Sequence, residues 1–220
     1  DIVKHNRLRL WLLGGIVLFA FFLRIYKVTN IPPSLSWDEV SIGYNAYSIL
    51  TTGRDEHQKL LPLDAFAAFG DYKPPLSIYL TVPAVAIFGL NEFAVRFPSV
   101  VFGTLTVVVT YFLVLELLGA SQVPGFAAPS GTGANRVSLI ATLLLAISPW
   151  HIQLSRAGFE ANIATFFVAL GMFLLLVARR SPVYWRVCWI PFVVGTYTFN
   201  SSRYFWPIFA VGFVLANKKI

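Results

Sequence analysis

Cysteine, methionine and charge are all scarce in this sequence. Its 220 residues include one methionine and one cysteine, Cys188, so the chain can form neither an internal disulfide nor a cysteine-based zinc site. Charged residues make up 12% of the chain, about half the share found in soluble domains. The sequence also lacks a glycine-rich phosphate loop, an HExxH motif and a GxSxG motif, so nothing supports nucleotide hydrolysis or zinc proteolysis.

Hydrophobic residues, by contrast, make up 57% of the chain, which predicts an all-α, multi-pass integral membrane protein. The net charge of +7 does not indicate nucleic-acid binding, because the basic residues stand mainly at the ends of apolar runs. In those positions they set orientation and meet lipid phosphates. Membrane lipids are therefore expected partners, and nucleic acid is not.

Six membrane spans and one long outer loop are predicted, in a single domain over 1–220. The spans fall at about 9–28, 97–118, 137–150, 161–178, 184–199 and 204–217, and the outer loop covers about 29–96. Within that loop, 39–50 follows a capping residue and repeats apolar residues at helical spacing, which predicts an amphipathic helix on the membrane surface. Segment 119–135 is expected to be a flexible cytoplasmic loop.

The run 76–90 decides the topology. It is short, follows Pro74 and Pro75, and has Pro83 at its centre, which is typical of an interfacial rather than a spanning segment. If it does not cross, nine basic residues lie on the inner side, against Arg156 and Arg203 in the short outer loops. The nine are Lys4, Arg7, Arg9, Arg136, Arg179, Arg180, Arg186, Lys218 and Lys219. Both termini are then cytoplasmic.

Two adjacent acids in the outer loop, Asp38 and Glu39, are the candidate catalytic residues. A carboxylate beside a membrane can act as a general base on a hydroxyl while its neighbour shifts or shares the charge. The alternative is structural, since Asp38 could cap the helix that follows and Glu39 could favour its positive end. A cap and a base are not exclusive.

Cations at the outer ends of the spans are candidate substrate-binding residues. The full set, with the acids beside them, is Asp71, Lys73, Arg96, Arg156, Glu160 and Arg203. Because basic residues are disfavoured on the outer side, these cations indicate an anionic partner. The alternatives are a snorkelling Lys73 and a helical Arg156–Glu160 pair.

Metal binding is left open. Asp55, Glu56 and His57 have the ligand chemistry for a divalent ion, but three consecutive side chains converge with difficulty, and a solvated polar turn is the alternative. His151 fits an interfacial histidine with its hydrogen bonds satisfied as well as it fits any functional role. No cofactor is assigned.

Six motifs in order cover the chain from about 30 to 207. They are WDE at 37–39, TGRDEH at 52–57, GDYKPPL at 70–76, GLNEFAVRFPS at 89–99, SRAGFE at 155–160 and YTFNSSR at 197–203. This set resembles the GT-C glycosyltransferases, in particular the bacterial relatives of dolichyl-phosphate-mannose protein mannosyltransferases and of aminoarabinose transferases. The resemblance implies a GT-C-like helix bundle with surface helices in the first outer loop.

The same resemblance implies a function. A sugar would pass, with inversion, from a polyprenyl-phosphate donor to a hydroxyl of a protein, lipid or glycan acceptor on the non-cytoplasmic face of a bacterial or archaeal cell membrane. Asp38, with Glu39 beside it, would be the catalytic acid residue, Lys73 would contact the carrier phosphate, and Arg156 and Glu160 would complete the pocket. Tyr72 stands where aminoarabinose transferases have an acid, which counts against a metal there.

Two other functions fit the same residues. A transporter or flippase of an anionic polyprenyl-linked lipid could use the outer cations without a base, but it should show paired broken helices in two related halves. A non-catalytic membrane subunit for envelope assembly would tolerate the loss of both Asp38 and Glu39. Because relatives have more spans, 1–220 is expected to be the N-terminal part of a longer chain.

Overall fold

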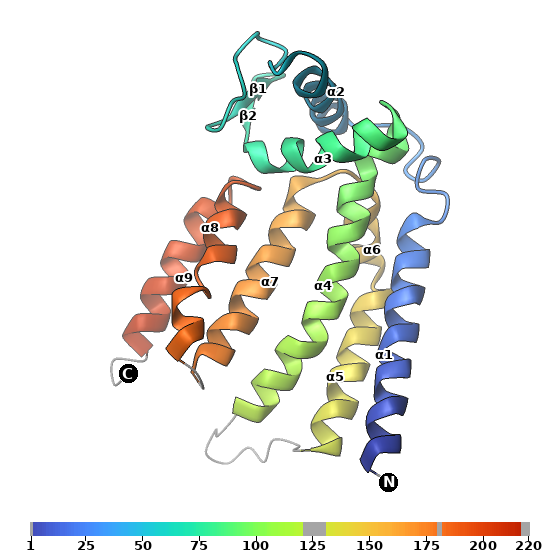
Figure 1. The fold of residues 1–220 in the computed structure, drawn as a ribbon, viewed down its shortest axis with the longest axis vertical. Coiled ribbons are helices and arrows are strands. Elements are labelled where there is room, and N and C mark those ends of the chain that lie inside the picture. The colour runs from blue at the N-terminus through green and yellow to red at the C-terminus, as the bar shows by residue number, and fades with distance from the viewer. Residues whose placement is uncertain (1, 121–130, 180–181, 217–220) are drawn as a thin grey trace.

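A computed structural model describes residues 2–120, 131–179 and 182–216. A bundle of roughly aligned helices is capped at one end by a smaller layer (Figure 1). The bundle contains α1 (Ile2–Ile25), α4 (Glu92–Ala120), α5 (Thr132–Ile147), α6 (Pro149–Arg156), α7 (Glu160–Ala178), α8 (Ile190–Thr196) and α9 (Ser202–Ala216). The cap contains α2 (Trp37–Thr52), β1 (Phe66–Ala68), β2 (Asp71–Lys73) and α3 (Pro75–Phe88).

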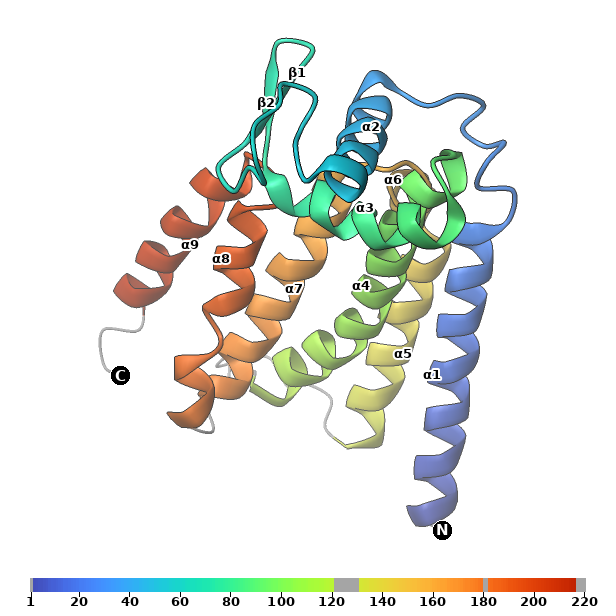
Figure 2. The same ribbon diagram turned by 45° about the horizontal axis from the view of Figure 1, so that its top comes forward.

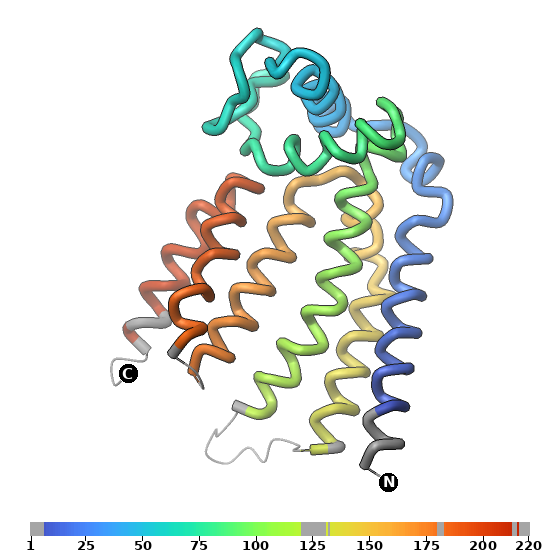
Figure 3. The backbone as a smooth tube through the Cα atoms, viewed as in Figure 1, coloured from blue at the N-terminus to red at the C-terminus, as the bar shows by residue number. Residues whose placement is uncertain are grey.

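With α5 and α6 taken as one bent segment, the successive parts of the bundle run alternately toward the cap and away from it (Figure 3). Within the described ranges, three helices are long and apolar enough to cross a membrane, namely Arg7–Ile25, Glu92–Gly119 and Glu160–Ala178. A fourth crossing results if the bent pair Gly133–Ile147 and Pro149–Arg156 forms one span. The predicted all-α, multi-pass membrane fold is confirmed, while the count of six crossings stays a prediction.

Two segments predicted as single spans are interrupted by prolines. The chain bends by 55° between α5 and α6, because Pro149 has no N–H with which to continue the helix. Segment 184–199 is a 3₁₀ turn, η1 (Pro182–Arg186), followed by the short α8 with Pro191 in its first turn, a position where proline starts a helix well. Residues 121–130 of the predicted cytoplasmic loop lie outside the described residues.

The first helix of the cap, α2, has well-defined ends. The Ser36 side chain accepts a hydrogen bond from the Glu39 backbone N–H at 3.3 Å, and the Glu39 side chain accepts one from the Ser36 N–H at 2.8 Å. This capping box satisfies two of the donors left over at a helix start. Gly53 ends the helix with φ of 68°, a left-handed conformation that glycine adopts without strain.

The second cap helix, α3, lies across the ends of α4 and α7 in both Figure 1 and Figure 2. Its 14 residues span about 21 Å at 1.5 Å per residue, which is short of the roughly 30 Å hydrocarbon core of a bilayer. This geometry fits the interfacial segment predicted at 76–90. One apolar cluster containing Ile42, Phe66, Ile78 and Ala94 joins α2, β1, α3 and α4, so the cap is packed onto the bundle.

Candidate active site

A buried lysine in the cap gathers three carboxylates. The Nζ atom of Lys73 forms an ion pair with Oδ1 of Asp38, lies 3.6 Å from Asp71 Oδ2, and lies 3.5 Å from Glu160 Oε1. Asp38 comes from the first turn of α2 and Glu160 from the first residue of α7. The structure therefore brings together four of the predicted site residues, at the junction of the cap and the bundle.

The position of Lys73 follows from a tight hairpin. β1 and β2 are antiparallel, with Phe66 opposite Lys73, and the turn at Phe69-Gly70 has φ of 52° and 81°. Side chains alternate along a strand, so Tyr72 is exposed while Lys73 is buried. The backbone N–H of Leu76 donates to the carbonyl of Tyr197 at 2.9 Å, which ties this strand end to the turn between α8 and α9.

Three acidic side chains share one cation in the Lys73 cluster. Burial alone would lower the pKa of Lys73, but the hydrogen bond to Asp38 and the charges of Glu160, Asp38 and Asp71 outweigh it and raise the pKa. Lys73 therefore carries its positive charge at neutral pH, facing three acidic side chains. Their side-chain exposures are 32% for Asp38, 64% for Asp71 and 10% for Glu160. Asp38 and Asp71 thus form the accessible side of the cluster.

Glu39, the other predicted catalytic acid, lies in a separate and closed environment. Its Oε1 accepts hydrogen bonds from Arg96 Nε at 2.7 Å and from the Gly158 N–H at 3.0 Å. Its Oε2 accepts from the Ser36 N–H at 2.8 Å and from Arg96 Nη2 at 3.4 Å. Burial alone would raise the pKa of Glu39, yet these bonds lower it overall. Glu39 is 1% exposed, and its catalytic role stays a prediction.

Arg96, predicted to bind substrate, is also enclosed. Besides Glu39, its guanidinium donates to the carbonyls of Val28 at 2.6 Å, Pro32 at 2.9 Å and Ser34 at 2.7 Å. Arg96 thus fixes the segment between α1 and α2 to the start of α4. The contacts of the Glu39–Arg96 pair, whose Glu39 is next to Asp38 in the chain, are with protein groups, and the roles expected of the two residues stay predictions.

The family described as dolichyl-phosphate-mannose-protein mannosyltransferase matches this chain over residues 15–195. The chain belongs to this family. All four residues of the Lys73 cluster lie within the match. An uncharacterized protein of Aquifex aeolicus (strain VF5) is 28% identical over 116 residues, which make up 51% of this chain but 20% of that relative. The resemblance to GT-C glycosyltransferases is thereby confirmed.

In this member of the mannosyltransferase family, Arg156 faces α1 and not the Lys73 cluster. Its Nη1 donates to the carbonyl of Leu23 at 2.8 Å, its Nη2 to that of Tyr26 at 2.6 Å and its Nε to that of Ile31 at 3.1 Å. Arg156 ends α6 and Glu160 begins α7, so the two do not form a pair along one helix. The donor-binding role of Arg156 stays a prediction.

Arg203 stays exposed, apart from the Lys73 cluster. Its Nε donates to the carbonyl of Thr196 at 3.2 Å. The side chain lines an open groove of about 610 Å³ together with Asp64, Tyr197 and Trp206. Since the turn between α8 and α9 also contacts the strand end after Lys73, the groove and the cluster share one side of the cap.

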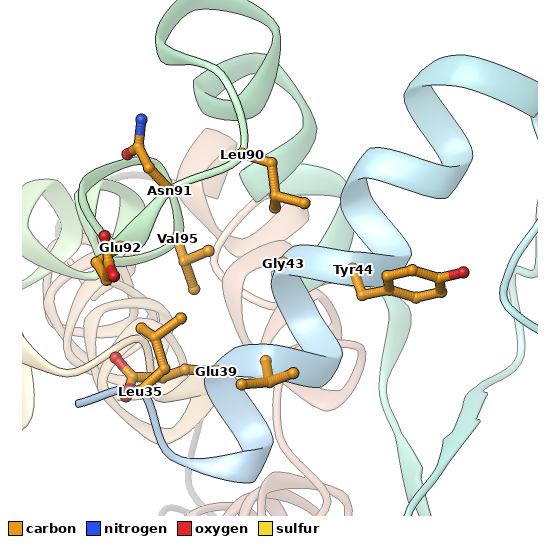
Figure 4. Close-up of a pocket in the computed structure, with 9 residues that line it drawn as sticks. Leu35, Glu39, Gly43, Tyr44, Leu90, Asn91, Glu92 and Val95 are labelled. Atoms are coloured by element: carbon orange, nitrogen blue, oxygen red, sulfur yellow. The ribbon is translucent and has the colours of Figure 1, made fainter.

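A second groove, of about 310 Å³, lies between α2 and the turn that joins α3 to α4 (Figure 4). Its lining includes Tyr44, Leu90, Glu92 and Glu39, and it does not include Asp38 or Lys73. At Gly43 the helix approaches α4 so closely that a Cβ would lie 2.6 Å from a methyl of Val95. This groove is therefore separate from the candidate catalytic cluster.

The polar run Asp55–His57 forms a turn held by hydrogen bonds. Asp55 Oδ1 accepts from the backbone N–H groups of His57 at 2.9 Å and Lys59 at 2.8 Å, and Asn45 exchanges two hydrogen bonds with Glu56, each of 3.1 Å. Among residues 2–120, 131–179 and 182–216, no group of three or more His, Cys, Asp and Glu is arranged to hold a metal ion. The possible divalent metal that the sequence left open therefore stays a prediction.

Two features of the site were not anticipated from sequence. The backbone N–H of Gly158 binds Glu39, and a Cβ at Gly158 would lie 3.2 Å from the carbonyl oxygen of Val95, so glycine suits this position. The other is Arg24, which lies at the end of an apolar run and is fully buried. A charge inside a predicted span is the signal that could have identified Arg24.

Proposed function

We propose that this protein is an inverting glycosyltransferase that acts on the non-cytoplasmic face of a cell membrane. The donor is a sugar linked to a polyprenyl phosphate, and the acceptor is a hydroxyl of a protein, lipid or glycan. The proposal is supported by the family assignment and by one observation above all, the buried Lys73 held by Asp38 at the junction of cap and bundle.

Asp38 is the general base in this proposal. It accepts the proton of the acceptor hydroxyl while the acceptor oxygen bonds to the anomeric carbon from the face opposite the phosphate. The bond between that carbon and the phosphate oxygen breaks, and the released lipid phosphate gains negative charge. About a third of the Asp38 side chain is exposed, at 32%, so an acceptor can reach it, whereas Glu39 is enclosed.

Lys73 stabilises the leaving phosphate. A fixed cation aimed at developing negative charge acts strongly in a site that excludes water. Because three carboxylates already surround Lys73, an arriving phosphate must replace one of them. Asp71 is the most exposed of the three and its oxygen is the most distant, at 3.6 Å, so Asp71 is the partner expected to leave. Arg203 is the predicted cation that remains available as a second ligand of the donor.

The test uses full-length protein in liposomes supplied with radiolabelled polyprenyl-phosphate sugars and with extracted membrane acceptors. Asp38→Asn should lower the rate of transfer by about 10²–10⁴-fold, the usual contribution of a positioned general base. Glu92→Gln is the control, because Glu92 is an exposed acid that lines the groove without Asp38 or Lys73. Normal turnover by Asp38→Asn would refute the base assignment.

The donor site is tested separately. Lys73→Ala should weaken binding of the donor lipid phosphate, with Lys59→Ala as the control, and equal binding by both would remove Lys73 from the site. Movement of labelled lipid across the bilayer without transfer would favour the transporter. Normal envelope assembly after loss of both Asp38 and Glu39 would favour the non-catalytic subunit.

A further inference from the structure

Arg24, in the last turn of α1, is fully buried. Among the residues that the structure describes, no carboxylate forms an ion pair with it. Its guanidinium instead donates to the carbonyls of Ala20 at 2.9 Å and Ala146 at 3.1 Å, with that of Leu145 at 3.5 Å. A buried charge held only by neutral groups is costly in a membrane segment, which makes it a candidate for a functional role.

The contacts of Arg24 lie at the bend between α5 and α6. In an unbroken helix, the carbonyl of Leu145 would accept from residue 149 and that of Ala146 from residue 150. Pro149 has no N–H, and the chain bends there by 55°. Arg24 therefore supplies a donor to the carbonyl of Ala146 at this bend and lies 3.5 Å from that of Leu145, which also accepts from the Ser148 N–H at 3.3 Å.

His151, in the first turn of α6, completes the contact. Arg24 Nη2 lies 2.6 Å from His151 Nδ1. Arginine has donors only, so Nδ1 must accept, and His151 is neutral with its proton on Nε2. Both His151 Nε2 and Arg24 Nε are buried without a hydrogen-bond partner in the described part of the chain. An apolar pair would avoid that cost, so stability alone does not explain this arrangement.

The other end of α6 is held by a matching contact. Arg156, its last residue, donates to three carbonyls at and after the end of α1. Helices α1 and α6 thus each contribute an arginine that binds carbonyls at the end of another helix. Arg24 of α1 binds those of α5, and Arg156 of α6 binds those of α1. Two residues after Arg156 comes Gly158, whose N–H binds Glu39, and then Glu160, which faces Lys73.

We propose that Arg24 and His151 are positioning residues, which fix α6 so that Gly158 and Glu160 meet the cap at the correct place. This inference rests on the proposed glycosyl transfer for its effect on rate. The contact of Arg24 with His151, called the brace below, acts through α6 on Gly158 and so on Glu39, the neighbour of the proposed base Asp38, whereas Lys73 is held by the hairpin of the cap. Loosening it should therefore slow the chemical step more than it weakens donor binding.

The experiment compares two substitutions of His151 in the full chain. His151→Asn keeps an acceptor close to the position of Nδ1, and His151→Leu removes it. A misplacement of about 1 Å can cost up to about 10²-fold in rate, so His151→Leu is expected to lower kcat by about 10- to 100-fold. KM for the donor should change by less than about 3-fold, and His151→Asn should retain a kcat within about 3-fold of the parent protein.

Hydrogen–deuterium exchange supplies a readout that does not depend on activity. Amides of residues 150–158 should exchange faster in His151→Leu than in the parent protein, with those of 97–118 unchanged and His151→Asn resembling the parent. Three outcomes would contradict the positioning role of Arg24 and His151. They are equal exchange rates in the two variants, an unchanged kcat in His151→Leu, and an equal loss of kcat in the two variants. If the parent protein transfers no sugar, the proposed function fails, and the exchange data alone decide the brace.

Discussion

Two lysines of the segment between α1 and α4, Lys59 and Lys73, pair with aspartates in different surroundings. Lys59 Nζ lies 2.7 Å from both carboxylate oxygens of Asp64, five residues along the chain, and the two side chains are 51% and 71% exposed. Lys73 is 3% exposed and pairs with Asp38, 35 residues away, and with Glu160 of the bundle. One pair belongs to a single turn, and the other joins three parts of the fold.

This difference in burial predicts which pair contributes more to the stability of the fold. Water and salt screen an exposed pair, and ordering two long side chains offsets much of the attraction. Neither water nor salt can replace the partner of a buried charge, so the loss of that partner leaves an uncompensated charge inside the protein. Short distance alone therefore does not show that an ion pair contributes to stability, whereas burial combined with several partners indicates it.

The largest effect on stability is expected at Glu39, which has the most enclosed carboxylate. Glu39→Gln would leave Arg96 without its counter-ion, and breaking a buried pair costs about 3–5 kcal/mol. The measurement is reversible unfolding of the purified protein in mixed detergent micelles, with Asp64→Asn as the exposed control. Equal stability of Glu39→Gln and the control would contradict the contrast between buried and exposed pairs.

A smaller loss is expected at Lys73. Lys73→Met would leave Asp38, Asp71 and Glu160 facing one another, at a cost of roughly 1–3 kcal/mol, because two of the three retain contact with water. Lys59→Met should leave the unfolding curve unchanged. If burial is the cause, adding Asp38→Asn to Lys73→Met should recover part of the loss, and a further decrease would count against it.

A packing change without any change of charge should have a similar or smaller effect. In Gly158→Ala, the new Cβ would lie 3.2 Å from the Val95 carbonyl oxygen and 3.3 Å from Glu39 Cγ, and such overpacking costs about 1–3 kcal/mol. Gly14→Ala is the matched control, since nothing lies within 4 Å of a Cβ there. Equal melting temperatures for the two variants would show that the loop at Gly158 yields freely.

The smallest effect is the pH dependence of stability. The hydrogen bonds from Arg96, Ser36 and Gly158 overcome burial and lower the pKa of Glu39 in the folded protein. Its contribution is therefore present above the unfolded pKa of about 4.3 and is lost as pH falls through the folded pKa. Unfolding between neutral and acidic pH should show a steeper loss in the parent protein than in Glu39→Gln, and parallel curves would exclude Glu39 as the source.

Much of the site could be predicted from sequence. Asp38, Asp71, Lys73 and Glu160 carry chemistry that stands out in an apolar chain, and the structure places them together. The role of Glu39 could not be decided in the same way, because its partners Arg96 and Gly158 lie 57 and 119 residues away. Whether an acid beside a helix start is a base or a clamp depends on those distant contacts.

The same limit applies to the arginines and to the helices. A cation at the outer end of a span can meet a phosphate or a carbonyl, and for Arg156 the carbonyls at the end of α1 are closer partners. Hydropathy finds α1, α4 and α7 because each is continuous. It does not reveal the bend at Pro149 or the short α8, where proline ends one helical run and starts another.

The division of the Lys73 cluster between cap and bundle has a consequence for biosynthesis. Asp38 and Lys73 leave the ribosome before Glu160, which is made about 90 residues after Lys73 and therefore several seconds later at about 5–20 residues per second. A growing chain therefore cannot complete the cluster until α7 has entered the membrane.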